Sequence, residues 1–149
     1  YSLLSKVDLV RIAHVGSTAI NGIWAKPTID ILIETKNKKE FEVVYQVLLD
    51  GGYSCMYKNE RIGFNKGYTK DGFAERVFHI HVRNHGDHDE LYFRDYMNEK
   101  SLLAKEYEDL KLELWKQYEH DRDGYTEAKT DFIKTYTEQA KKEYAGRYE

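Results

Sequence analysis

Residues 11–33 read RIAHVGSTAINGIWAKPTIDILI, and they decide the fold that the sequence predicts. Residues 28–33 form a nearly continuous run of apolar residues, which is typical of a strand buried on both faces of a sheet. Residues 7–15 form a second strand pattern, which ends at a Gly-Ser dipeptide. The single proline, Pro27, disfavours helix at the residue before it. We therefore predict two strands joined by a loop or short helix, with residues 28–33 central in the sheet.

The rest of the chain is predicted to extend this sheet and then to become helical. Residues 39–50 have the helical period, with Phe41, Val44, Tyr45 and Leu48 on one face and two glycines after them. Antiparallel strands are expected at residues 53–57, 61–68 and 75–82, and helical stripes within residues 103–118 and 125–140, with residues 122–124 separating the two helices. This order predicts an α+β fold with one sheet, helices packed on it and a helical C-terminal segment. The 149 residues suit a single domain over 1–149.

Composition narrows the class of protein. The net charge of -3 gives no global reason to expect nucleic acid as a partner. No apolar run approaches the roughly 20 residues that span a bilayer, so no membrane partner is expected. The single cysteine, Cys55, cannot form an internal disulfide and reads as a packed thiol in a strand. These features favour a cytoplasmic protein.

The first candidate for chemistry is Gly16-Ser17 followed by Asp30. A Gly-Ser turn after a strand exposes backbone N–H groups that can bind a phosphate, and we expect these groups to face an open cleft. A carboxylate in an apolar strand is costly unless it is paired or bound to metal. Strand alternation places Asp30 on one face with Thr28 and Leu32. The alternative for Asp30 is an ion pair with a structural lysine or arginine.

The second candidate is the pair His79 and His81. Two histidines at i and i+2 of a strand point to the same face and can ligate one metal ion or contact one phosphate. The alternative is a pair of exposed or hydrogen-bonded histidines. We predict that Asp30 lies on the same face as both imidazoles, close enough to share an ion.

The third candidate is a set of basic and aromatic residues in the helical segment: Arg94, Lys111, Tyr125 and Lys129. Tyr125 and Lys129 are four apart and therefore adjacent on a helix. These side chains can reach phosphate groups. For each lysine alone, a solvated or snorkelling surface position is the simpler interpretation.

Together these residues resemble the GrpB-like family, which is placed in the nucleotidyltransferase superfamily. The resemblance rests on five segments in order, from about residue 10 to residue 133: residues 11–18, residues 25–31, residues 79–82, residues 93–96 with Tyr107 and residues 110–111, and residues 125–129 with Phe132. It implies a mixed nucleotidyltransferase-like sheet. The family usually has a helical segment before the first strand, so the resemblance also implies that an N-terminal helix is truncated here.

The resemblance implies a role for each matching residue. Ser17 and Asp30 would be catalytic, and Asp30, His79 and His81 would hold a divalent metal ion, Mg²⁺ or Mn²⁺ first and Zn²⁺ or Fe²⁺ as alternatives. The residues implied for binding nucleotide or phosphate are Gly16, Ser17, Thr18, Lys26, Arg94, Lys111, Tyr125 and Lys129. Leu32 departs from the superfamily, which places a second carboxylate two residues after the first. Because Mg²⁺ prefers hard oxygen ligands, one aspartate with two histidines better suits a softer ion.

Three functions follow as hypotheses. The first is metal-dependent transfer of a nucleotidyl group to an unidentified acceptor. The second, motivated by Leu32, is an inactive module that binds a nucleotide or phosphorylated metabolite, in a setting linked to coenzyme A metabolism. The third is a metal-dependent hydrolase. All three predict a nucleotide or another phosphorylated small molecule as the partner.

Overall fold

The computed structural model describes residues 4, 7, 9–23, 28–69 and 72–148, with residues 67–69, 72–76 and Arg122 described by their backbone only. These residues form two compact units. The first unit comprises Tyr1–Ala19 and Lys26–His88, and the second comprises Ile20–Ala25 and Asp89–Glu149. The sequence predicted a single domain over this range.

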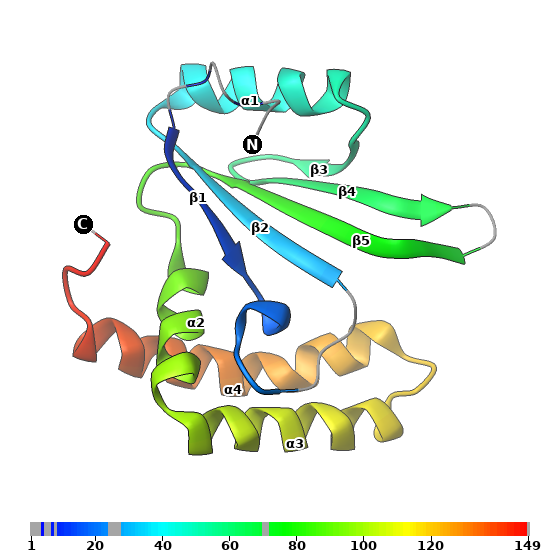
Figure 1. Ribbon diagram of the computed structural model, residues 1–149, viewed down its shortest axis with the longest axis vertical. Coiled ribbons are helices and arrows are strands. Elements are labelled where there is room, and N and C mark those ends of the chain that lie inside the picture. Colours follow the sequence, from blue (N-terminus) through cyan, green and yellow to red (C-terminus); the bar gives the residue numbers. More distant parts are fainter. Residues whose placement is uncertain (1–3, 5–6, 8, 24–27, 70–71, 149) are drawn as a thin grey trace. The chain divides into compact units, whose positions relative to one another are not determined.

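The first unit is built on a five-stranded mixed sheet with the order β1-β2-β5-β4-β3 (Figure 1). Its strands are β1 (Leu9–Val15), β2 (Thr28–Thr35), β3 (Ser54–Lys58), β4 (Ile62–Thr69) and β5 (Gly72–Arg83). The predicted α+β class and the antiparallel pairing of β3 with β4 and of β4 with β5 are confirmed. The interior position predicted for residues 28–33 is also confirmed, because β2 lies between β1 and β5.

The parallel pairing of β2 with β5 determines which side chains meet in this sheet. In its register Asp30 is the partner of His79 and Leu32 is the partner of His81. The connection between these two strands contains α1, β3 and β4. It brings together residues about 50 positions apart, and the antiparallel strand β1 pairs along the other side of β2.

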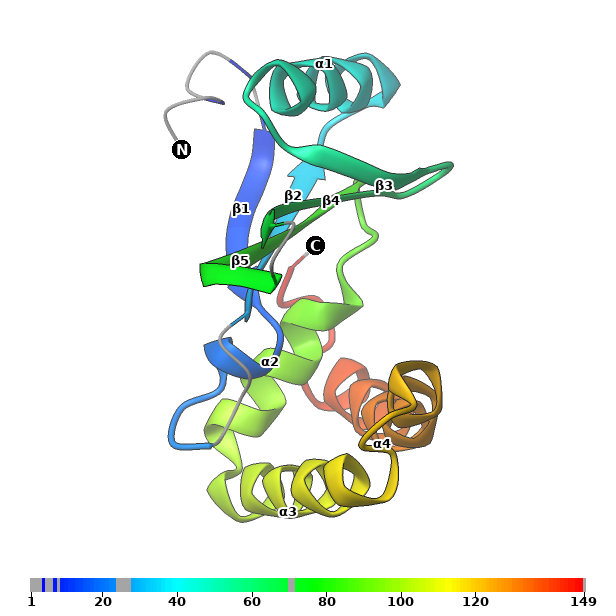
Figure 2. The same ribbon diagram turned by 90° about the vertical axis from the view of Figure 1, so that its right-hand side faces the viewer.

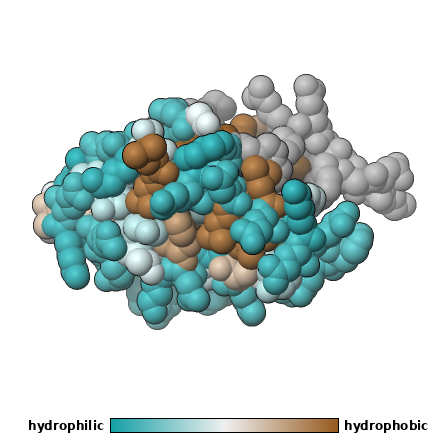
Figure 3. Space-filling model, turned by 90° about the horizontal axis from the view of Figure 1, so that it is seen from below, coloured by the Kyte–Doolittle hydropathy of each residue, from teal (hydrophilic) through white to brown (hydrophobic). Residues whose placement is uncertain are grey.

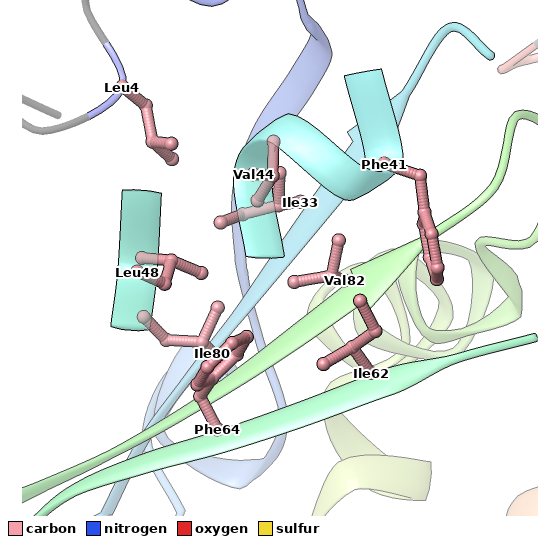
Figure 4. Packing of buried hydrophobic residues seen from close by; sticks show 9 residues of the cluster. All are labelled: Leu4, Ile33, Phe41, Val44, Leu48, Ile62, Phe64, Ile80 and Val82. Atoms are coloured by element: carbon pink, nitrogen blue, oxygen red, sulfur yellow. The ribbon is translucent and has the colours of Figure 1, made fainter. Parts of the chain in front are cut away.

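Helix α1 (Lys38–Asp50) covers one face of the sheet, as both views show (Figures 1 and 2). The Asn37 side chain caps its first turn by accepting a hydrogen bond from the Glu40 N–H at 2.9 Å. The predicted apolar face is confirmed, and Figure 4 shows it packing against side chains from the strands. The buried cluster contains Leu4, Ile33, Phe41, Val44, Leu48, Ile62, Phe64, Ile80 and Val82.

Strand β3 is an edge strand, and all five of its residues are exposed. The expectation of a packed thiol at Cys55 is therefore wrong. An edge strand has a neighbour on one side only, and a register shift between Cys55 and Tyr57 disturbs its pairing with β4.

The second unit is helical, with α2 (Asp89–Glu99), α3 (Ser101–Gln117) and α4 (Arg122–Glu143). Its core is aromatic: the rings of Tyr107 and Phe132 stack at 5.3 Å between centroids, and Phe93 meets Tyr107 edge-on at 5.2 Å. The prediction that residues 122–124 separate two helices is wrong, because they form the first turn of α4. Asp121 supplies the cap instead, and its side chain accepts from the Gly124 N–H at 3.0 Å.

Apolar side chains also reach the surface. The face seen in Figure 3 is mostly hydrophilic with hydrophobic patches between polar side chains. On α3 the exposed large hydrophobic residues are Leu102, Leu112 and Trp115. Within the described residues, no helix combines the length and apolar character needed to cross a membrane.

Candidate functional site

Asp30 lies at the third residue of β2 and has neighbours on both sides in the sheet. Val15, the last residue of β1, is its partner on one side, and His79 of β5 is its partner on the other. Because side chains alternate along a strand, Asp30 points away from the face that carries Ile31, Ile33 and α1. The apolar side of β2 thus builds the core, while the opposite side presents the carboxylate.

The Asp30 carboxylate lies between the two predicted imidazoles. Its Oδ1 atom is 3.0 Å from Nε2 of His81 and 3.8 Å from Nδ1 of His79. The three side chains are partly accessible, with exposed fractions of 24%, 26% and 18% for Asp30, His81 and His79. The prediction that they share one face, drawn from strand alternation, is confirmed.

The hydrogen bond between Asp30 and His81 defines a proton position. An ionised carboxylate can only accept, so Nε2 of His81 carries the hydrogen. A cation that used this nitrogen would have to replace that proton. The described contact between Asp30 and His81 is therefore a hydrogen bond that holds one hydrogen between the two side chains.

The donor set can be tested against a metal ion. One carboxylate oxygen and two imidazole nitrogens are donors that suit Mn²⁺, Fe²⁺ or Zn²⁺. Across the described ranges, no group of three or more His, Cys, Asp or Glu side chains is placed so that it could hold a metal ion. The donor types of Asp30, His79 and His81 suit such an ion. The positions that they take in the structure are those of a hydrogen bond between Asp30 and His81.

Gly16 ties the loop after β1 to the carboxylate. Its φ of +75° lies in the left-handed region that favours glycine. A Cβ atom at Gly16 would lie 2.5 Å from Oδ2 of Asp30, which is far inside van der Waals contact. A side chain at this position would therefore displace the carboxylate.

The loop continues into a single 3₁₀ turn, η2 (Ser17–Ala19), in which the Ala19 N–H donates to the Gly16 carbonyl at 3.1 Å. The β1–β2 pairing ends at Val15 and Asp30, so Gly16 and Ser17 lie beyond the sheet ladder. The Thr18 hydroxyl donates to the Thr28 carbonyl at 3.0 Å. The hydroxyl hydrogen of Thr18 is thus used in a hydrogen bond within the protein. The donor that Thr18 can offer to a phosphate is its main-chain N–H.

Comparison with known proteins places this chain in a family. The family model described as GrpB protein matches residues 2–139, which is most of the chain. The chain belongs to the GrpB family. The resemblance inferred from residues 11–18, 25–31 and the later segments is thereby confirmed at the level of the family.

Several GrpB relatives have known sequences or structures. Over 82% of its length the chain is 36% identical to glutamate-rich protein GrpB of Alkalihalophilus pseudofirmus, covering 74% of that protein. It is 33% identical to UPF0157 protein YqkA of Bacillus subtilis over 94% of its own length, and it spans 41% of YqkA. The crystal structure of conserved protein GrpB from Enterococcus faecalis matches with a TM-score of 0.79 and 25% identity, over 96% of this chain and 86% of that one.

The remaining predicted site residues of this GrpB chain belong to the second unit, apart from Lys26, which lies outside the described residues. Arg94 on α2 donates from Nε to Asp95 at 3.0 Å and from Nη2 to the Tyr148 hydroxyl at 2.9 Å. Lys129 lies over the Tyr125 ring at 5.0 Å from its centroid, and burial raises the pKa of Tyr125. These contacts lie within the helical unit, whereas Asp30 and the histidines lie in the first.

Lys111 differs from the simple expectation of a surface lysine. It is 2% exposed, and its ammonium lies 4.9 Å from the centroid of the Tyr107 ring. A desolvated cation over an aromatic face gains electrostatic stabilisation from the ring. Lys111 is therefore a buried part of the aromatic core in this GrpB chain.

Two residues in the first unit carry polar contacts that the sequence did not reveal. His14 contacts the Thr18 hydroxyl through Nε2 at 2.8 Å. Glu34 is buried at the far end of β2, 3.0 Å from Nε of Arg11, and it accepts from the Gly86 N–H at 3.0 Å. The sequence does contain a signal for Glu34, because an acid at the end of an isoleucine-rich strand is expected to need a partner. The contact of His14 depends on the loop conformation, which has no signal in the strand pattern.

Proposed function

We propose that the Asp30–His79–His81 cluster and the Gly16–Thr18 loop bind a divalent cation together with the phosphate groups of a nucleotide. The proposal rests on one observation: the Asp30 carboxylate lies between two imidazoles and directly against the left-handed Gly16. A carboxylate alone would repel phosphate. A cation shared by these donors would reverse that local charge and allow phosphate to lie beside the loop.

Within this proposal the residues of the chain have separate tasks. Gly16 permits close approach between the loop backbone and Asp30, and the N–H groups of Ser17 and Thr18 offer donors to phosphate oxygens. Asp30 and His81 hold a proton in the cation-free state. The bound cation would neutralise phosphate charge, which is a main requirement of phosphoryl-type transfer.

The activity that we propose is nucleotidyl transfer. An acceptor hydroxyl oxygen forms a bond to the α-phosphorus of a nucleoside triphosphate. The bond from that phosphorus to the bridging oxygen breaks, pyrophosphate leaves, and the hydroxyl proton is released. The support for this activity is the resemblance of residues 11–18, 25–31 and 79–82 to the GrpB-like family, which is placed in the nucleotidyltransferase superfamily.

A second candidate is a module that binds nucleotide without transferring it. Leu32 favours this alternative. It occupies the position two residues after Asp30 on the same face, and it is fully buried. A buried leucine contributes no oxygen to a second cation, so chemistry that requires two metal ions would lack one of its carboxylates.

Label transfer distinguishes these functions. The protein is incubated with Mn²⁺, ATP labelled at the α-phosphate and an extract of small metabolites, and new labelled species and pyrophosphate are separated. New adducts with released pyrophosphate support transfer, and bound but unchanged ATP supports the binding module. Phosphate release without adducts supports a hydrolase.

Asp30→Asn should abolish each of these signals, whereas Asp50→Asn is a matched control because Asp50 is an exposed acid at the end of α1. If Asp30→Asn leaves nucleotide and Mn²⁺ binding unchanged, the proposed site is wrong.

A further inference from the structure

A chain of two hydrogen bonds joins the end of β1, the loop after it and the start of β2. Nε2 of His14 lies 2.8 Å from Oγ1 of Thr18, and Oγ1 of Thr18 lies 3.0 Å from the carbonyl oxygen of Thr28. Three segments that flank the candidate site are thus connected through one hydroxyl group.

The chemistry of the three groups fixes the direction of this chain. The Thr28 carbonyl can only accept, so the Thr18 hydroxyl donates its single hydrogen to it. The Thr18 oxygen must therefore accept from His14, and Nε2 of His14 carries a hydrogen. To keep both hydrogen bonds, the side chain at position 14 needs a hydrogen-bond donor that reaches the Thr18 hydroxyl oxygen.

Thr18 and Thr28, which this pair of hydrogen bonds joins, are close in sequence to the residues that form the candidate site. Thr28 is two residues before Asp30 on β2, and Thr18 is two residues after Gly16 in the loop. Gly16 itself lies against the Asp30 carboxylate, where no space exists for a Cβ atom. A shift of Thr18 relative to Thr28 would therefore move the loop N–H groups relative to the carboxylate.

We propose that His14 is a positioning residue that holds the Gly16–Thr18 loop against the start of β2, and that it thereby sets the phosphate affinity of the loop. The part that concerns phosphate rests on the proposed function. His14 is exposed at the end of β1 and acts through Thr18, without contact to the reacting atoms. Its replacement should weaken ligand binding without unfolding the sheet.

Two variants separate the donor from the bulk of the ring. His14→Gln keeps an N–H donor on a side chain of similar reach, and His14→Leu removes the donor. With pyrophosphate and Mn²⁺ as the probe in a calorimetric titration, His14→Leu should bind about 10-fold more weakly than wild type, as is typical when a residue that orients a binding group is lost. His14→Gln should bind within about 3-fold of wild type, since a retained donor keeps the orienting contact.

A second measurement needs no ligand. In ¹⁵N–¹H spectra of the cation-free protein, the Gly16, Ser17 and Thr18 amide signals should shift and exchange faster with solvent in His14→Leu, and should stay close to wild type in His14→Gln. This arm tests positioning even if the wild-type protein binds neither Mn²⁺ nor pyrophosphate.

The outcomes are distinct. Loop signals that are unchanged in His14→Leu overturn the positioning role. If the loop amide signals shift in His14→Leu while its affinity for pyrophosphate equals that of wild type, the proposed link between loop position and phosphate binding is wrong. Equal losses of affinity in His14→Leu and His14→Gln would show that the ring, and not its N–H donor, is what matters, which also contradicts the proposal.

Discussion

Strand β2 carries two acids four residues apart on the same face of the sheet, and they have opposite environments. The Glu34 side chain is 1% exposed, paired with Arg11 and bonded to the Gly86 N–H. The Asp30 side chain is 24% exposed, and its described partners are the imidazoles of His79 and His81. One strand thus holds a buried carboxylate paired with arginine at one end and a partly exposed carboxylate beside two imidazoles at the other.

The partners of the two acids differ in their chemistry. Arginine keeps its charge at every accessible pH, so the pair at Glu34 is a fixed structural contact. Imidazolium can lose a proton near neutral pH, and a neutral imidazole nitrogen can bind a metal ion, so a contact with histidine depends on conditions in a way that a contact with arginine does not. Burial and partner type therefore identify Glu34 as a residue of the fold and Asp30 as the candidate for function.

The largest effect on stability is expected at Glu34. Glu34→Ala removes the charged partner of Arg11 and the acceptor of the Gly86 N–H. Breaking a buried ion pair costs about 3–5 kcal/mol, and we expect about 3 kcal/mol because Arg11 is one quarter exposed. Denaturant unfolding followed by circular dichroism measures the loss.

The control for this variant is Glu42→Ala, which removes the exposed pair of Glu42 with Lys58. Its effect should stay below about 0.5 kcal/mol. Equal losses in the two variants would contradict the assignment of Glu34 to the fold.

Gly16→Ala should have the next largest effect and should link stability to the site. The added Cβ combines a left-handed φ with a clash against Asp30, and strain of this type costs about 2 kcal/mol. Gly22 is a matched control, since its φ is +76° but a Cβ there meets nothing within 4 Å. Gly22→Ala should therefore cost only about 1 kcal/mol. Thermal unfolding compares the two, and a Gly16 variant no worse than the Gly22 variant would show that the contact with Asp30 is unimportant.

Asp30→Asn should have the smallest effect on stability. Asparagine keeps an oxygen that can accept from His81, and the site is partly solvated, so the free energy of unfolding should change by less than about 1 kcal/mol. Denaturant unfolding of the metal-free protein tests this. A loss as large as that of Glu34→Ala would place Asp30 among the residues of the fold and remove the reason for treating it as a functional group.

The sequence predicted most of the first unit because its signals are local. Period-two alternation and β-branched residues marked the strands, and the same alternation placed Asp30 with His79 and His81 on one face. The parallel pairing of β2 with β5 had no local signal, since it depends on a crossover through α1, β3 and β4.

Other features depend on tertiary contacts and escaped the sequence for that reason. The close approach of Gly16 to Asp30 and the contact of His14 with Thr18 require the loop conformation itself. The start of α4 was misplaced because Gly124 reads as a helix breaker, whereas the Asp121 cap makes it part of the first turn. Lys111 reads as a surface cation, but aromatic packing in the second unit buries it.

The central claim is that Asp30 is the acid of this strand that binds a cation, and calorimetric titration with Mn²⁺ tests it most directly. Wild-type protein and Glu34→Gln, checked to be folded, should bind one Mn²⁺, and Asp30→Asn should show no binding. Binding should strengthen as pH rises, because a histidine ligand binds a metal ion in its neutral form. Mn²⁺ binding that survives in Asp30→Asn, or a wild-type protein that binds no Mn²⁺ with or without pyrophosphate, would contradict the account.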